Sequence, residues 1–227
     1  MTNDLTKRSY KTAAMCGWAF VALLAVGNLL PGLPPGPGAS ANEISQYFAV
    51  HRAIFLCAVF LEGLSVWPYL IFVVALASAL TEEDPDPLRG QLMAFAGVAG
   101  AVALAVAGFW ATLAFEAPSG YGPEVTRAVF ALGNLGYNFI GFPFAAFVAL
   151  ASLRMRKTLW SPRWIAWLGF LASAGQLITA AAFARDGIFS PGGSSFIAAF
   201  ALFALWIVLT SFRLWRWNLE RPINAAS

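Results

Sequence analysis

Six long segments with few or no charged residues limit what this chain can fold into. They span residues 13–30, 44–80, 91–115, 125–153, 164–184 and 194–215. A helix needs about 20 apolar residues to cross a hydrocarbon core of ~30 Å, and five segments match or modestly exceed that length. Because a backbone in lipid must satisfy its own hydrogen bonds, we expect helices, and the alternation typical of a membrane β-barrel is absent. The sequence predicts an all-α, polytopic integral membrane bundle of about six transmembrane helices, forming a single domain over residues 1–227.

The composition agrees with a surface that faces lipid. Hydrophobic residues make up 59% of the chain and charged residues only 11%, whereas soluble domains carry about 25% charged residues. The net charge of +3 does not indicate a nucleic-acid partner, because the basic residues fall at predicted helix ends and form no single patch. The partner that the composition predicts is the lipid bilayer.

The distribution of basic residues predicts the orientation. With six helices, eleven of the 14 Lys and Arg residues fall on the side of the termini, and three, Arg52, Arg127 and Arg185, fall on the other. Cytoplasmic loops carry the excess of Lys and Arg. We therefore expect both termini in the cytoplasm and the protein in the cell membrane, the inner membrane where there are two.

The start of the second segment allows two interpretations. Ser40 and Glu43 have the spacing of a capping box, which predicts a helix start. Ala39-Ser40-Ala41 also resembles the cleavage site of a secretory signal peptide. The first apolar segment is longer than the usual 7–15 residues of a signal, so we expect it to be retained as a transmembrane helix. The second segment is much longer than a span requires, which predicts a strong tilt or a projection beyond the bilayer.

Polar residues at membrane depth are the candidate functional residues. The second segment carries His51, Arg52 and Glu62. His51 and Glu62 are 11 residues apart, which puts them within about 20° of one face, with a rise of about 16.5 Å. His51 should therefore lie near the outer surface and Glu62 near the middle of the membrane.

The fourth segment repeats this pattern with Arg127, Asn134 and Asn138. Arg127 and Asn138 are also 11 residues apart, so the two co-directional helices should present matching polar columns. We predict that Glu62 and Asn138 come within hydrogen-bonding reach, directly or through water. Gln176 on the fifth segment should lie at a similar or slightly more external level.

Each of these residues has a functional and a structural interpretation. An intramembrane carboxylate is costly, so Glu62 is a candidate protonatable site or partner for a cationic ligand. Alternatively, a neutral Glu62 could donate a hydrogen bond to a neighbouring helix. The side chains of Asn134, Asn138 and Gln176 commonly serve as hydrogen-bonding glue between helices. His51 and Arg52 could simply mark the membrane interface.

No complete catalytic, cofactor or metal motif is present. A single histidine rules out a bis-histidine haem within this chain, and no Cys/His spacing suggests zinc. The Gly-rich stretch at 190–194 lacks the lysine of a phosphate-binding loop. The sequence therefore predicts no cofactor, no metal and no catalytic residue.

Three functions remain open. The first is the binding or transport of a small or lipophilic molecule in an outward-opening polar cavity between the second and fourth helices. Glu62, Asn134 and Asn138 would form its centre, Gln176 would lie nearby, and His51, Arg52 and Arg127 would form its mouth. The second is an accessory subunit of a membrane complex, with a membrane-protein partner or a second copy of the chain. The third is an intramembrane enzyme that acts on a lipid; it lacks a visible pair of nucleophile and base.

Overall fold

The computed structural model describes residues 2–81, 88–116, 122–158, 160–184, 187–190 and 193–220, and every regular element in these ranges is an α-helix. The all-α prediction is confirmed for this part of the chain. The helices are α1 (Thr2–Leu29), α2 (Ala41–Val50), α3 (Arg52–Leu80), α4 (Leu88–Glu116), α5 (Pro123–Phe139), α6 (Gly141–Lys157), α7 (Arg163–Ala180) and α8 (Ser194–Glu220).

Five helical segments are long and apolar enough to cross a membrane, judged by length and composition. They are Ser9–Leu29, Arg52–Leu80, Leu88–Glu116, Pro123–Lys157 and Ser194–Trp217. They support the prediction of a membrane protein. α7 has 18 residues and is not among them.

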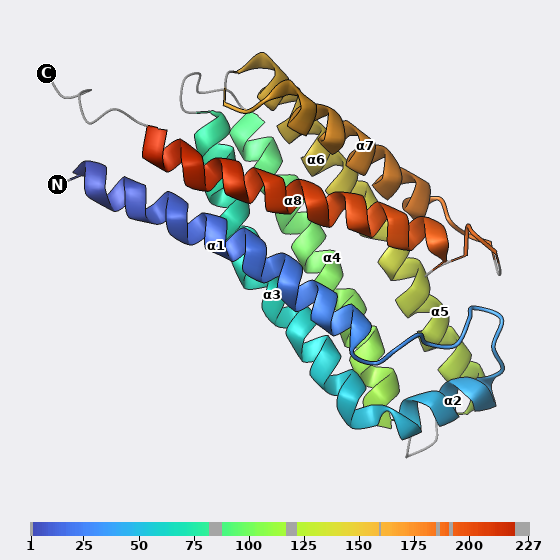
Figure 1. The fold of residues 1–227 in the computed structure, drawn as a ribbon. Coiled ribbons are helices and arrows are strands. Elements are labelled where there is room, and N and C mark those ends of the chain that lie inside the picture. The colour runs from blue at the N-terminus through green and yellow to red at the C-terminus, as the bar shows by residue number, and fades with distance from the viewer. Residues whose placement is uncertain are drawn as a thin grey trace, which may run out of the picture.

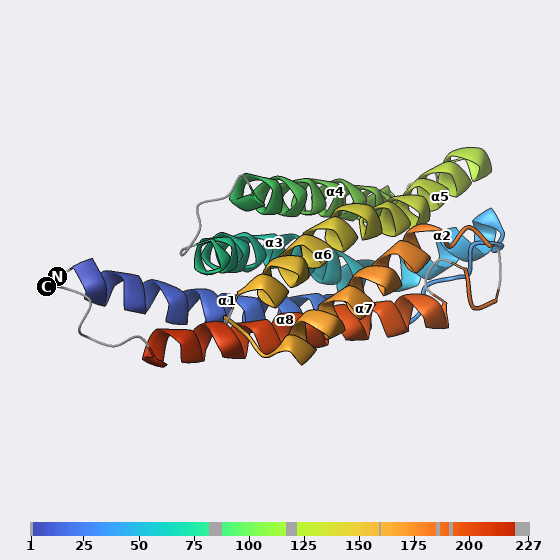
Figure 2. The same ribbon diagram turned by 90° about the horizontal axis from the view of Figure 1, so that it is seen from above.

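The long helices run side by side, and α2 lies across one end of the bundle (Figures 1 and 2). α1 packs against α3 and α8, and α7 packs between α6 and α8. α4 packs against both α3 and α5, whereas α3 and α5 make no direct backbone contact. α1 begins and α8 ends at the same end of the bundle (Figure 1).

The predicted helix over 44–80 is in fact two helices that meet at His51. His51 has φ −99° and ψ 12°, outside the α-helical range. The chain turns here because Ile44 and Phe48 of α2 pack beneath the ends of α4 and α5, in a cluster with Trp110 and Phe130. The predicted capping box is confirmed, since the Ser40 side chain accepts from the Glu43 backbone and the Glu43 side chain accepts from the Ser40 backbone.

The predicted helix over 125–153 is also divided, into α5 and α6. Ile140 between them keeps helical angles, so the two form one bent segment. Pro143 explains the bend, because it has no N–H to donate to the preceding turn. The other boundaries differ mainly in extent: α1 begins at Thr2 rather than 13, and α7 ends at Ala180 rather than 184.

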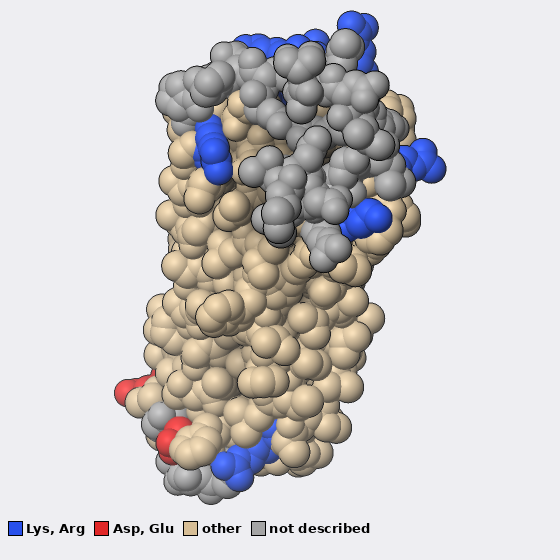
Figure 3. Space-filling model, turned by 90° about the vertical axis from the view of Figure 1, so that its left-hand side faces the viewer, with Lys and Arg blue, Asp and Glu red and all other residues tan. Residues whose placement is uncertain are grey.

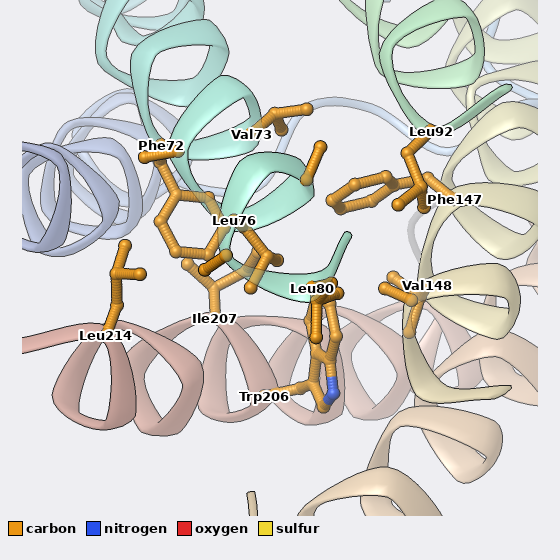
Figure 4. Close-up of a cluster of buried hydrophobic side chains, with 14 of the residues drawn as sticks. Phe72, Val73, Leu76, Leu80, Leu92, Phe147, Val148, Trp206, Ile207 and Leu214 are labelled. Carbon is orange, nitrogen blue, oxygen red and sulfur yellow. The ribbon is translucent and has the colours of Figure 1, made fainter. Parts of the chain in front are cut away.

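Two apolar clusters fill the bundle, one toward each end. The larger lies toward the termini and joins α3, α6 and α8 through Phe72, Leu76, Phe147, Trp206 and Ile207, all buried (Figure 4). The smaller lies beneath α2 and includes Phe48, Phe55, Trp110 and Phe130. The candidate site lies between these two clusters.

Candidate functional site

A cavity lies inside the bundle, and seven of its 16 described lining residues are aromatic. Its volume is about 70 Å³, counted as the space that the centres of water molecules can occupy, which is enough for several waters. Helices α1, α3, α4, α6, α7 and α8 all contribute to it, as does Tyr137 of α5. The lining residues are Phe20, Leu24, Glu62, Ser65, Val66, Tyr69, Gly100, Ala103, Tyr137, Ile140, Phe144, Gln176, Thr179, Phe196, Phe200 and Phe203.

Glu62 of α3 contributes the only carboxyl group among the described residues that line this cavity. Its Oε1 lies 3.4 Å from the hydroxyl of Tyr137, and the same hydroxyl lies 2.8 Å from Oδ1 of Asn28 on α1. A phenol has one proton to donate, so the shorter contact, to Asn28, takes the stronger bond. The hydroxyl of Tyr137 therefore holds the carboxyl group only weakly.

Gly27 explains how α1 can approach α3 at this level. A Cβ atom on residue 27 would lie 2.8 Å from Cγ of Glu62 and 3.1 Å from the carbonyl oxygen of Ala58. Both distances are shorter than ordinary contacts between these atoms. The absence of a side chain at Gly27 therefore brings Asn28 within reach of Tyr137, which faces Glu62.

Tyr69 places a second polar group in the cavity wall. Its side chain is only 1% exposed, and its ring packs against Phe20 and Phe144 at centroid distances of 4.9 and 5.6 Å. Its hydroxyl makes no hydrogen bond within the described part of the chain. A buried hydroxyl without a partner costs free energy, and a ligand or water in the cavity would supply the missing bond.

Gln176 and Thr179 bring α7 to the cavity. The side-chain amide of Gln176 donates to the carbonyl oxygen of Ala199 on α8 at 3.4 Å, and the hydroxyl of Thr179 donates to the carbonyl oxygen of Gln176. α6 can approach α7 closely at this level because Gly141 has no side chain. A Cβ atom at this position would lie 2.5 Å from the carbonyl oxygen of Gln176. Of the seven residues predicted for the site, only Glu62 and Gln176 line this cavity.

Glu62 and Asn138 form no direct hydrogen bond in the described part of the chain, so the direct form of the predicted contact is wrong. Asn138 is buried, and its amide donates to the carbonyl oxygen of Ala182, beyond the end of α7. Tyr137, one residue earlier, faces Glu62 instead. Adjacent helical residues point about 100° apart, so Asn138 faces the end of α7 when Tyr137 faces Glu62.

The other predicted residues also lie elsewhere. Asn134 donates to the carbonyl oxygen of Phe130 in its own helix and, with Arg127, lines a separate pocket beneath the loop at 37–39. That pocket has a volume of about 340 Å³. The observed cavity is lined by residues of both the second and the fourth predicted segments, but Arg127, Asn134 and Asn138 are not among them.

His51 and Arg52 mark the junction of α2 and α3. The ring of His51 stacks on Tyr47, with 4.5 Å between centroids, and its Nδ1 lies 2.9 Å from the carbonyl oxygen of Tyr47. The guanidinium of Arg52 lies over the ring of Phe115 on α4. Neither residue lines the central cavity. Arg185, expected on the same side, lies outside the described residues.

Asn28 and Tyr137 were not predicted as site residues. The sequence offers one faint signal, the Gly-Asn-Leu that occurs at 27–29 and again at 133–135. Both asparagines donate to the carbonyl four residues earlier in their own helix. Only Asn28 also reaches the cavity, through Tyr137.

The described residues contain no group of three or more His, Cys, Asp and Glu side chains that could hold a metal ion. Cys16 and Cys57 are both free thiols. No protein-family model, no curated protein and no solved structure matches this chain. Function is therefore inferred from the geometry of the cavity and from the distribution of charge.

Proposed function

We propose that the chain crosses the cell membrane six times, with both termini in the cytoplasm. Five spans are apparent from length and composition. An odd number would put the start of α1 and the end of α8 at opposite ends of the bundle, but they lie at the same end (Figure 1). α7 supplies the sixth crossing. Its 18 residues give a length of about 27 Å, close to the ~30 Å of a hydrocarbon core.

The charges at the two ends support this orientation. In Figure 3, Lys and Arg side chains lie at both ends and the middle of that face carries no charge. The described basic residues near the termini are Lys11, Arg89, Arg154, Arg156, Lys157, Arg163, Arg213 and Arg216, and those near α2 are Arg52 and Arg127. The positive-inside rule assigns the first group to the cytoplasm. A single cysteine at Gly36, in a variant without Cys16 and Cys57, should react with an impermeant maleimide in intact cells; reaction only after permeabilisation would contradict this orientation.

The function that the cavity supports best is the binding, or carriage across the membrane, of a small lipophilic molecule with a positively charged group. The observation that carries this proposal is the Glu62 carboxyl group facing an aromatic cavity whose wall also holds the unpartnered hydroxyl of Tyr69. Aromatic faces attract cations, and a carboxylate at membrane depth is stabilised by an opposite charge. An aromatic wall with one carboxylate therefore favours a cation over an anion.

Tetramethylammonium is a suitable probe for a cavity of this size, because it is among the smallest organic cations and keeps its charge at every pH. Neopentane has the same shape without the charge, so it is a matched control ligand. We expect the purified protein to bind the cation at least about tenfold more tightly than the neutral analogue, since one charge contact in a desolvated site contributes about 1–2 kcal/mol or more. Binding should weaken as the pH falls, because protonation removes the charge of the carboxylate.

Glu62→Gln tests the role of the carboxylate, because it keeps the size and hydrogen bonding of the side chain but not its charge. It should lose the preference for the cation, while Glu124→Gln, at the start of α5, should keep it. Tyr69→Phe should bind the cation and leave the fold intact. If neither ligand binds, or if Glu62→Gln binds the cation as tightly as the wild type, the proposal fails. A stoichiometric protein partner after gentle purification would then favour an accessory subunit.

A further inference from the structure

A second pocket, remote from the central cavity, lies where α6 ends and α7 begins. Its volume, counted in the same way, is about 430 Å³. Residues from the end of α6, the connection to α7 and the facing side of α8 line it. They are Arg156, Lys157, Thr158, Ser161, Pro162, Arg163 and Arg213.

Four of these lining residues are cationic, and none of the described lining residues is acidic. Like charges gathered around one pocket repel each other, so an anion between them relieves the repulsion. Arg156 lies over the ring of Trp167, 4.8 Å from its centroid. Nε of Arg213 donates to the carbonyl oxygen of Trp160. These contacts hold two guanidinium groups at the pocket, and the ring of Trp167 does so without neutralising the charge of Arg156.

The backbone at the pocket also favours an anion. α7 begins here, with Pro162 at its N-cap and no side-chain hydrogen bond to the first turn. The first N–H groups of a helix point toward its N-terminus and carry partial positive charge. A phosphate group in the pocket would meet these N–H groups together with the four cationic side chains, an arrangement that recurs in phosphate sites.

The tryptophans of α7 place this pocket at the depth of lipid head groups. Trp164 and Trp167 are 55% and 59% exposed and lie within the first two turns of α7, beside Arg163. Exposed tryptophan at the end of a membrane helix is typical of the interface between head groups and acyl chains. A ligand that reaches the pocket from the bilayer would therefore present a head group.

We propose that this pocket binds the phosphate of an anionic phospholipid from the cytoplasmic leaflet. Zwitterionic lipids carry the same phosphate with a compensating ammonium group, so the four cations favour lipids with a net negative charge. Soluble phosphate has the same donor requirements but no acyl chains. The experiment must therefore separate the lipid from the soluble ion.

Native mass spectrometry of the full chain, released from detergent with added lipid, gives the needed measurement. We expect phosphatidylglycerol to be retained in preference to phosphatidylcholine with the same acyl chains. Lys157→Gln/Arg163→Gln removes two exposed cations of the pocket. It should lower retention of phosphatidylglycerol by about tenfold or more, at roughly 1 kcal/mol for each basic residue.

Arg89→Gln/Arg216→Gln is the matched control. It removes the same charge from exposed residues outside the pocket at the same end of the bundle, and it should change retention less than about threefold. Equal losses in the two double variants would overturn the proposal, because they would indicate attraction by net charge alone. Inorganic phosphate that stabilises the wild type against heating as much as phosphatidylglycerol does would overturn the assignment to a lipid. Neither result bears on the central cavity, since both double variants leave Glu62 and Tyr69 unchanged.

Discussion

Gly141→Ala should destabilise the protein, because it would force α6 and α7 apart. The added Cβ would lie 2.5 Å from the carbonyl oxygen of Gln176 and 3.1 Å from the Cβ of Ala180. The first of these atoms belongs to the backbone of α7 and cannot rotate away. An ordinary contact needs roughly 3.4 Å, so one helix must move by close to 1 Å, a strain of the kind seen on overpacking a well-filled core.

Overpacking costs about 1–3 kcal/mol. Alanine is favoured over glycine in a helix by up to about 1 kcal/mol, which offsets part of this cost. The offset is small at Gly141, because it lies at the first position of α6, next to the bend. We expect a net loss of about 2 kcal/mol and, at about 2–4 °C per kcal/mol for a chain of this size, a fall in Tm of about 4–8 °C.

Thermal unfolding in detergent, followed by tryptophan fluorescence, measures this loss. Gly97→Ala is the matched control, since Gly97 is exposed on α4 and a Cβ there would meet nothing within 4 Å. The control should unfold at the wild-type temperature or slightly above it. A Gly141→Ala protein that unfolds within a degree of the control would refute the close approach of α6 to α7.

Three further variants test other contacts. Ser40→Ala removes the N-cap of α2, a loss of about 1 kcal/mol, so amides of α2 should exchange hydrogen about fivefold faster. The backbone N–H of Ser40, followed by its hydroxyl, lowers the pKa of Glu43 below its ordinary value of 4.5. The ionised Glu43 side chain therefore stabilises α2 above pH 4.5, and this stabilisation is lost as the pH falls through the lowered pKa. Acid should speed hydrogen exchange in α2 more in the wild type than in Glu43→Gln. An equal effect in the two proteins would contradict this. Arg154→Met removes the side chain that donates to the carbonyl oxygen of Leu80 at the end of α3. Thermal unfolding should show a loss of about 1–3 kcal/mol in the free energy of unfolding. The exposed Arg89→Gln is the control and should lose less than about 0.5 kcal/mol.

The apolar segments predicted the helical class and the approximate helix positions because lipid permits few alternatives to a helix. Breaks within a segment were missed, since they depend on contacts between distant parts of the chain. The turn at His51 follows from the packing of Ile44 and Phe48 against α4 and α5, and no local signal in the sequence specifies that contact. Pro143 was visible in the sequence, but a proline alone does not state where the next helix will point.

Prediction of the cavity residues was limited in the same way, because the direction of a polar side chain depends on how its helix packs against distant helices. Periodicity placed Glu62 on an inward face, and the structure has it at the cavity. Periodicity also favoured Asn138, but the neighbouring Tyr137 faces Glu62. An error of one position changes the direction of a side chain by about 100°, and only the packing of α5 against α4 decides between the two. Polarity alone favoured the amide side chains of Asn134 and Asn138 over the phenol of Tyr137, although it is Tyr137 that lines the cavity.

The pairing of α1 with α8 has a consequence for the order of assembly. Residues from both helices form the wall of the central cavity, and Phe20 of α1 meets Phe203 of α8 edge to face. α1 can pack on α3 early during synthesis, but its α8 partner emerges more than 160 residues later, since α1 ends at Leu29 and α8 begins at Ser194. In the proposed membrane location, lipid must cover the face of α1 that α8 will occupy until α8 inserts. A chain that stops before residue 194 lacks Phe196, Phe200 and Phe203, so one side of the cavity that holds Glu62 has no wall.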